Sequence, residues 1–182
     1  MKILFVLFTL ILSHPCFSKS IEIEFPVSTI IDKSNFFNSR VTITGLNGSA
    51  LASGDLAINS DGSFGSKKNI ITEAHLFDIE SEVISDLITS KDTSLIAWSV
   101  MANPIVRASG WSDVYSAKAV LFNHSYYGTK ELNINTPPIE GNPDLINRVA
   151  WSVKSKKDGT ISSINPGDTI SVTAIINLEA AL

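Results

Sequence analysis

Two histidines and a group of acidic side chains are the residues of this sequence best suited to acid–base or metal chemistry. His75 and His124 stand in no HExxH motif, and neither has a cysteine or carboxylate at a zinc-ligand spacing. The acidic group comprises Asp78, Glu80, Glu82 and Asp86. Its spacing along an expected helix is typical of a solvated face, not of paired carboxylates for general acid–base catalysis. We therefore predict no metal site and a structural role for His75.

The sequence also lacks the local motifs that mark many enzyme active sites. It contains no Gly-x-Ser-x-Gly elbow, no Walker loop, no GxGxxG motif after a strand and no EF-hand loop. Covalent catalysis needs a nucleophile, a base and a group that orients the base, and no such set can be nominated. The prediction is a protein that is not an enzyme and that needs no cofactor.

Aromatic side chains are the remaining candidates for ligand contact. Trp98, Trp111 and Trp151 are expected mainly in the core or packed on a sheet. Tyr126 and Tyr127 precede a glycine in what reads as a loop, and a packed turn is the favoured interpretation. Because exposed aromatic rings can stack on sugars, Trp111, Tyr126 and Tyr127 form the candidate contact of an alternative, sugar-binding function.

The first 18 residues predict export. Lys2 provides a positive start, residues 3–12 a short apolar run, and Ser18 a small residue at the expected cleavage site, with Ser20 as the alternative. The apolar run is too short to cross a bilayer, and no later stretch reaches the necessary length. We therefore expect residues 1–18 to be a signal peptide and the mature chain to begin at residue 19.

Cleavage at this point removes Cys16, the only cysteine, so disulfides are not expected to support the fold. The residues before Cys16 do not resemble a lipobox, which argues against a lipoprotein. The leader contains one lysine and no acid, so its loss changes the net charge from −4 to about −5. No basic patch or arm suggests binding to nucleic acid or to anionic lipid.

Alternating apolar residues and turn signals predict an all-β chain. Strands are expected over residues 21–27, 40–44, 56–58, 69–77, 93–101, 114–123, 131–135, 148–154 and 169–178. One short helix, or a turn between strands, is expected over residues 78–90, where apolar residues recur every three to four positions after an acidic start. Many short strands without a βαβ rhythm are typical of an immunoglobulin-like β-sandwich, here in a single domain.

The first and the last of these strands each need a partner to cover them. Residues 21–27 alternate strictly, with Ile21, Ile23, Phe25 and Val27 on one face and Glu22, Glu24 and Pro26 on the other. A terminal segment is poorly ordered unless something ties it down, so this one needs a groove. Residues 169–178 form a long β-rich run without charge, and such a strand left unpaired at an edge is an aggregation hazard.

Several segments, taken in order, resemble the major pilin subunits of the alternate chaperone–usher fimbriae, the colonisation-factor class. They are residues 21–32, the Gly-Ser-Ala-Leu turn at 48–51, 55–58, 85–100, 131–134 and 166–178. The sequence departs from the family in two places. Phe25 and Pro26 stand where small residues are usual, and residues 142–163 read as additional material before the final turn.

The resemblance implies an incomplete immunoglobulin-like domain, here residues 33–182, that lacks one strand. Residues 19–32 would be a donor strand that fills the same gap in the next subunit, with Ile21, Ile23, Phe25 and Val27 inserted. The implied partners are a periplasmic chaperone, an outer-membrane usher and neighbouring pilin subunits in a homopolymer. The implied location is the bacterial cell surface, where the fibre would support adhesion to a host-cell receptor.

Three alternatives stay open on the sequence. The chain could be a minor fimbrial subunit or a secreted carbohydrate-binding tip adhesin, although the adhesins of this family usually have two domains and about twice the length. A secreted enzyme on a β-sandwich would need catalytic groups assembled from scattered carboxylates, and it is the least favoured reading.

Overall fold

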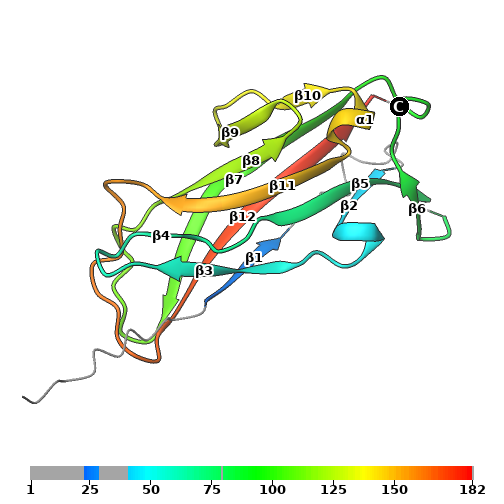
Figure 1. Ribbon diagram of the computed structural model, residues 1–182. Coiled ribbons are helices and arrows are strands. Elements are labelled where there is room, and N and C mark those ends of the chain that lie inside the picture. The colour runs from blue at the N-terminus through cyan, green and yellow to red at the C-terminus, as the bar shows by residue number, and fades with distance from the viewer. Residues whose placement is uncertain (1–22, 29–40, 79, 182) are drawn as a thin grey trace, which may run out of the picture.

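The computed structural model describes residues 23–28, 41–78 and 80–181. Strands account for 56% of the described residues, in largely antiparallel sheets with one short helix and one 3₁₀ turn, and the sheets do not close into a barrel. Figure 1 shows two layers of strands, with β7 and β12 behind β11, β5, β4 and β3. The all-β prediction is therefore confirmed at the level of fold class.

The elements follow one another closely along the chain. In order they are β1 (Ile23–Ser28), β2 (Val41–Thr44), the 3₁₀ turn η2 (Leu46–Gly48), β3 (Ser53–Ile58), β4 (Phe64–Ser66), β5 (Ile70–Asp78), β6 (Val83–Leu87), β7 (Ile96–Ser109), β8 (Ala119–Ser125), β9 (Gly128–Leu132), β10 (Ile139–Gly141), α1 (Pro143–Ile146), β11 (Arg148–Ser155) and β12 (Thr169–Ala180).

Strand β1 links the two layers. One layer contains β12 between β7 and β1, with β10 beyond β7. The other contains β3, β4, β11, β5 and β2, with β8 and β9 paired in turn to β11 and β6 paired to β5. Strand β1 pairs in parallel with β12 and antiparallel with β3, so the described strands form one continuous hydrogen-bonded path.

The core lies between the layers and follows the period-two alternation of the strands. Alternate residues of β12 are buried: Ile170, Val172, Ala174, Ile176 and Leu178. Across the core, the fully buried Trp98 of β7 and Trp151 of β11 meet edge to face, with ring centroids 5.9 Å apart. The expected core position is therefore correct for two of the three tryptophans.

Of the two possibilities predicted for residues 78–90, the helix is wrong, and the turn between strands is correct for residues 80–82. Asp78 Oδ1 instead accepts hydrogen bonds from the backbone N–H groups of Glu80 and Ser81, which closes a turn, and Glu82 adopts a positive φ of 55°. Strand β6 then pairs with β5. The acidic residues that suggested a favourable helix dipole supply turn geometry, and β-branched Val83 and Ile84 favour a strand.

The one α-helix of the described residues, α1, lies elsewhere. Asn142 caps it by accepting a hydrogen bond from Asp144 N at 2.9 Å, and Pro143 occupies the first helical position. This helix opens the segment 142–163 that the sequence marked as additional material. None of the helices in the described ranges is long and apolar enough to cross a membrane.

Predicted and observed strand boundaries agree best where apolar and polar residues alternate most regularly. β11 and β12 match the predictions closely, whereas β7 continues to Ser109 and residues 114–118 form a loop before β8. The short strands β4 and β10 were not predicted. The expected signal peptide, with Cys16, lies outside the described residues.

Candidate functional site

The second edge of β12 is the candidate functional site. Along its first edge, β12 pairs with β7 over its whole length, from Thr169 to Ala180. Along its second edge, in the part of the chain that the structure describes, it pairs only with β1, through Val27 opposite Ala174 and Ser28 opposite Ile175. A long strand, without charge over residues 169–178, is thus completed on one side by a short N-terminal strand in parallel orientation.

The structure describes residues 23–28 of the predicted donor segment, and it pairs them within the sheet of their own chain. Ile23 lies opposite Leu56 and Phe25 opposite Gly54 in the antiparallel ladder with β3, while Val27 pairs with β12. Ile21 lies outside the described residues. The backbone positions of three of the four predicted residues therefore lie between the two layers, along one strand.

The three residues of the sugar-contact alternative do not come together. Trp111 follows the end of β7 at Ser109, whereas Tyr127 lies against Gly141, which pairs with Ile96 at the start of β7. The 14-residue strand β7 separates these two places by about 40 Å at the usual rise per residue. Tyr126 contacts Tyr127 edge to face, so it lies with Tyr127 near the start of β7. A single contact surface made from these three side chains is therefore wrong.

Trp111 is not a core residue, because 88% of its surface is exposed. Tyr115, in the same loop between β7 and β8, is 99% exposed and was missed as a surface aromatic. The sequence placed Tyr115 inside an expected strand, where alternation gave no reason to single it out.

The buried Asp168, at the turn before β12, holds this loop in place. Its carboxylate accepts hydrogen bonds from Ser112 Oγ at 2.6 Å, Trp111 N at 3.0 Å and Asn165 N at 3.2 Å. The Ser112 hydroxyl, followed by the Trp111 backbone N–H, lowers the pKa of Asp168 below its ordinary value. Gly110, with φ of 97°, lets the backbone pass so close that a Cβ there would lie 2.0 Å from Asp168 Oδ1.

Acidification is expected to release the loop. Because the pKa of Asp168 is depressed in the folded protein, its contribution is complete above the ordinary carboxyl range and is lost as the pH falls through the folded value. Protection of the Trp111 amide, measured as its exchange rate relative to the intrinsic rate at the same pH, should therefore fall at low pH. Asp168→Asn should show this low protection at every pH, and retained protection of Trp111 N–H in that variant would show that the carboxylate does not hold the loop.

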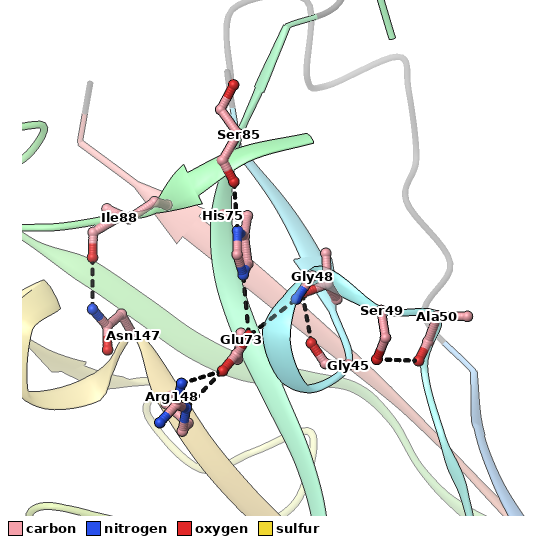
Figure 2. Close-up of polar contacts among 11 residues, drawn as sticks. Gly45, Gly48, Ser49, Ala50, Glu73, His75, Ser85, Ile88, Asn147 and Arg148 are labelled. Atoms are coloured by element: carbon pink, nitrogen blue, oxygen red, sulfur yellow. Dashed lines mark hydrogen bonds and ion pairs between the residues drawn. The ribbon is translucent and has the colours of Figure 1, made fainter. Parts of the chain in front are cut away.

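A second polar cluster, shown in Figure 2, surrounds the fully buried carboxylate of Glu73 on β5. Arg148 on β11 lies opposite Glu73 and donates to Oε1 through Nε at 2.6 Å and Nη2 at 2.5 Å. Oε2 accepts from Gly48 N of η2 at 3.3 Å and lies 3.1 Å from His75 Nε2. Burial alone would raise the pKa of Glu73, but the hydrogen bonds from His75, Arg148 and Gly48 outweigh it and lower the pKa.

This cluster binds strands together and has no reactive group in position. Gly48 joins η2 to β5, Arg148 joins β11 to β5, and His75 Nδ1 lies 2.6 Å from the carbonyl oxygen of Ser85 on β6. No hydroxyl or thiol nucleophile contacts the imidazole. Within the described ranges, no three His, Cys, Asp or Glu residues gather as metal ligands would. The acidic residues named for acid–base chemistry line an exposed turn and β6.

Comparison with known proteins gives no family for this chain. Neither a scan against protein-family models nor a search of curated proteins finds a match.

Proposed function

We propose that this protein is a structural subunit of a bacterial surface fimbria that polymerises head to tail by exchanging its N-terminal strand. The observation that carries the proposal is the second edge of β12, which only the N-terminal strand β1 completes among the described residues. The apolar face of β12 is buried and must stay covered. A strand that pairs with this edge in its own chain can pair with the same edge of another chain.

The proposed mechanism is β-strand addition. Main-chain hydrogen bonds to the edge of β12 supply affinity, and alternate side chains entering the core supply register. Each subunit would withdraw β1 from its place between β3 and β12 and insert its N-terminal segment, residues 19–31, beside the β12 of a neighbour. The N-terminal strand of each chain would contact the β12 edge of the next chain. Because these two surfaces differ, the contacts do not close into a ring and a filament results.

The remaining features of the proposal rest on the resemblance in sequence. They are an immunoglobulin-like arrangement of the two layers, capture of the open β12 edge by a periplasmic chaperone, transfer at an outer-membrane usher and adhesion of the finished fibre to host cells. The short parallel ladder between β1 and β12 supports exchange, because only two pairs of described residues must separate on that side.

Ile23→Asp tests the proposal. The alternation of residues 21–27 assigns Ile23 to the inserted row, so the variant would bring a carboxylate into an apolar slot, and polymer growth should stop. Glu24→Asp, on the opposite row, is the matched control and should polymerise normally. The measurement is the length of the polymers formed by purified chains, by electron microscopy. Polymers of normal length from Ile23→Asp would refute the assigned row.

A further inference from the structure

The surroundings of His75 differ in kind from those of His124. The two ring nitrogens of His75 face the carbonyl oxygen of Ser85 and the carboxylate of Glu73. Both partners only accept hydrogen bonds when the carboxylate is ionised. His124 lies between two hydroxyls, Thr129 Oγ1 and Ser152 Oγ, at 2.8 Å each. Because a hydroxyl can either donate or accept, His124 is satisfied with one ring proton, whereas His75 is not.

The geometry therefore fixes the number of protons around His75. Nδ1 must hold one proton to donate to Ser85 O. A second proton must lie between Nε2 and Glu73 Oε2, because two lone pairs would otherwise face each other at 3.1 Å. Arg148, bound to the other carboxylate oxygen, stabilises the ionised Glu73 and so favours this proton on the ring. His75 is thus an imidazolium in this arrangement.

We propose that His75 holds strand β6 against β5 only while both of its ring nitrogens are protonated. With a proton on each ring nitrogen it ties β6, through Ser85, to the buried Glu73 of β5, and loss of one proton releases β6. This role is independent of the fimbrial proposal, since it rests on the Glu73 cluster and not on the β12 edge.

Strand β6 is suited to such release because little else holds it. It pairs only with β5 among the described strands, and that ladder is interrupted by a register shift between His75 and Phe77. Its residues Val83 to Asp86 are exposed, including the apolar side chains of Val83 and Ile84. Beyond β6, Ile88 is buried and its N–H donates to Ala74 O, so the release would end there.

The charges around His75 set the direction of the effect. Glu73 on β5 and Arg148 on β11 contact the cluster directly, while the described parts of β2 and η2 carry no titratable side chain. The β5–β6 turn and β6 contribute exposed acids: Asp78, Glu80, Glu82 and Asp86.

The hold of His75 on β6 should therefore depend on pH. Each of its two hydrogen bonds needs a proton on the ring nitrogen that donates it, so the hold ends when the ring loses one proton. On the acid side, protonation of Glu73, whose pKa is lowered, would weaken the same contacts only below the ordinary carboxyl range.

Amide hydrogen exchange of the whole protein between about pH 5 and pH 8 tests the proposal, after correction for intrinsic exchange. The loss of one charge-assisted hydrogen bond predicts that protection of Val83–Leu87 falls about tenfold or more as the pH rises. His75→Gln should remove this dependence, and His124→Gln should keep it. Protection of β6 that stays constant with pH, or a dependence that survives in His75→Gln, would overturn the proposal.

A measurement on the unaltered protein guards against a variant that fails to fold. The ¹⁵N chemical shifts of the His75 ring report directly on its protons. Both nitrogens should be protonated at every pH where β6 is protected, and they should titrate together with the β6 exchange rates. A neutral His75 ring at a pH where the β6 amides remain protected from exchange would contradict the proposed role of His75.

Discussion

Replacing Trp98 by alanine is expected to lower the free energy of unfolding by about 3–5 kcal/mol, the range for truncating a fully buried aromatic residue. Trp98 is completely buried, stacks edge to face on Trp151, and donates from Nε1 to Ile146 O at 2.8 Å. Truncation would leave a cavity between the two layers and an unsatisfied carbonyl at the end of α1. Urea unfolding followed by far-ultraviolet circular dichroism measures the loss.

Trp111→Ala is the matched control, because Trp111 is the same residue type with 88% of its surface exposed. Its loss should change the free energy of unfolding by less than about 0.5 kcal/mol. Similar losses in the two variants would mean that the contact between Trp98 and Trp151 does not join the layers.

The sequence predicts strands well where alternation and turn residues act together. β12 follows a Pro-Gly-Asp turn and alternates without interruption, and its predicted start at residue 169 is the observed one. The helix predicted after β5 is not observed, because an apolar spacing of three to four residues fits a helix as well as it fits a turn followed by a strand. Pairing with β5, which depends on tertiary contacts, decided between the two.

The polar clusters were harder to predict because they are assembled across strands. Glu73 and His75 lie two residues apart, so strand periodicity could have placed them on one face. Arg148 joins them only through the register of β11 on β5. Equally, no pattern in the sequence shows that Trp111 would lie beyond the end of β7, exposed on a loop held by Asp168.

Removal of residues 1–31 is expected to have the largest effect on the protein. The proposed insertion of four apolar side chains, Ile21, Ile23, Phe25 and Val27, would be worth about 6–12 kcal/mol before ordering costs. This range is comparable to the whole stability of a typical domain. The shortened chain should therefore aggregate, or unfold at a lower temperature than the intact protein. A synthetic peptide of residues 19–31 should restore a folded complex of one chain and one peptide.

A peptide with Ile23 and Phe25 replaced by serine is the control for that experiment. It keeps the main-chain hydrogen bonds but loses most of the apolar burial, so it should restore little stability. Thermal unfolding monitored with each peptide measures the difference. A shortened chain that is fully stable and indifferent to both peptides would show that the second edge of β12 needs no donated strand.

Strand exchange between chains is tested most directly by analytical ultracentrifugation of the intact protein. The sample is warmed until β1 can leave its slot and then cooled, with or without an excess of the residue 19–31 peptide. Exchange predicts a series of head-to-tail polymers without peptide, and single chains carrying peptide when it is present. A protein that returns to monomer in both samples would contradict the account.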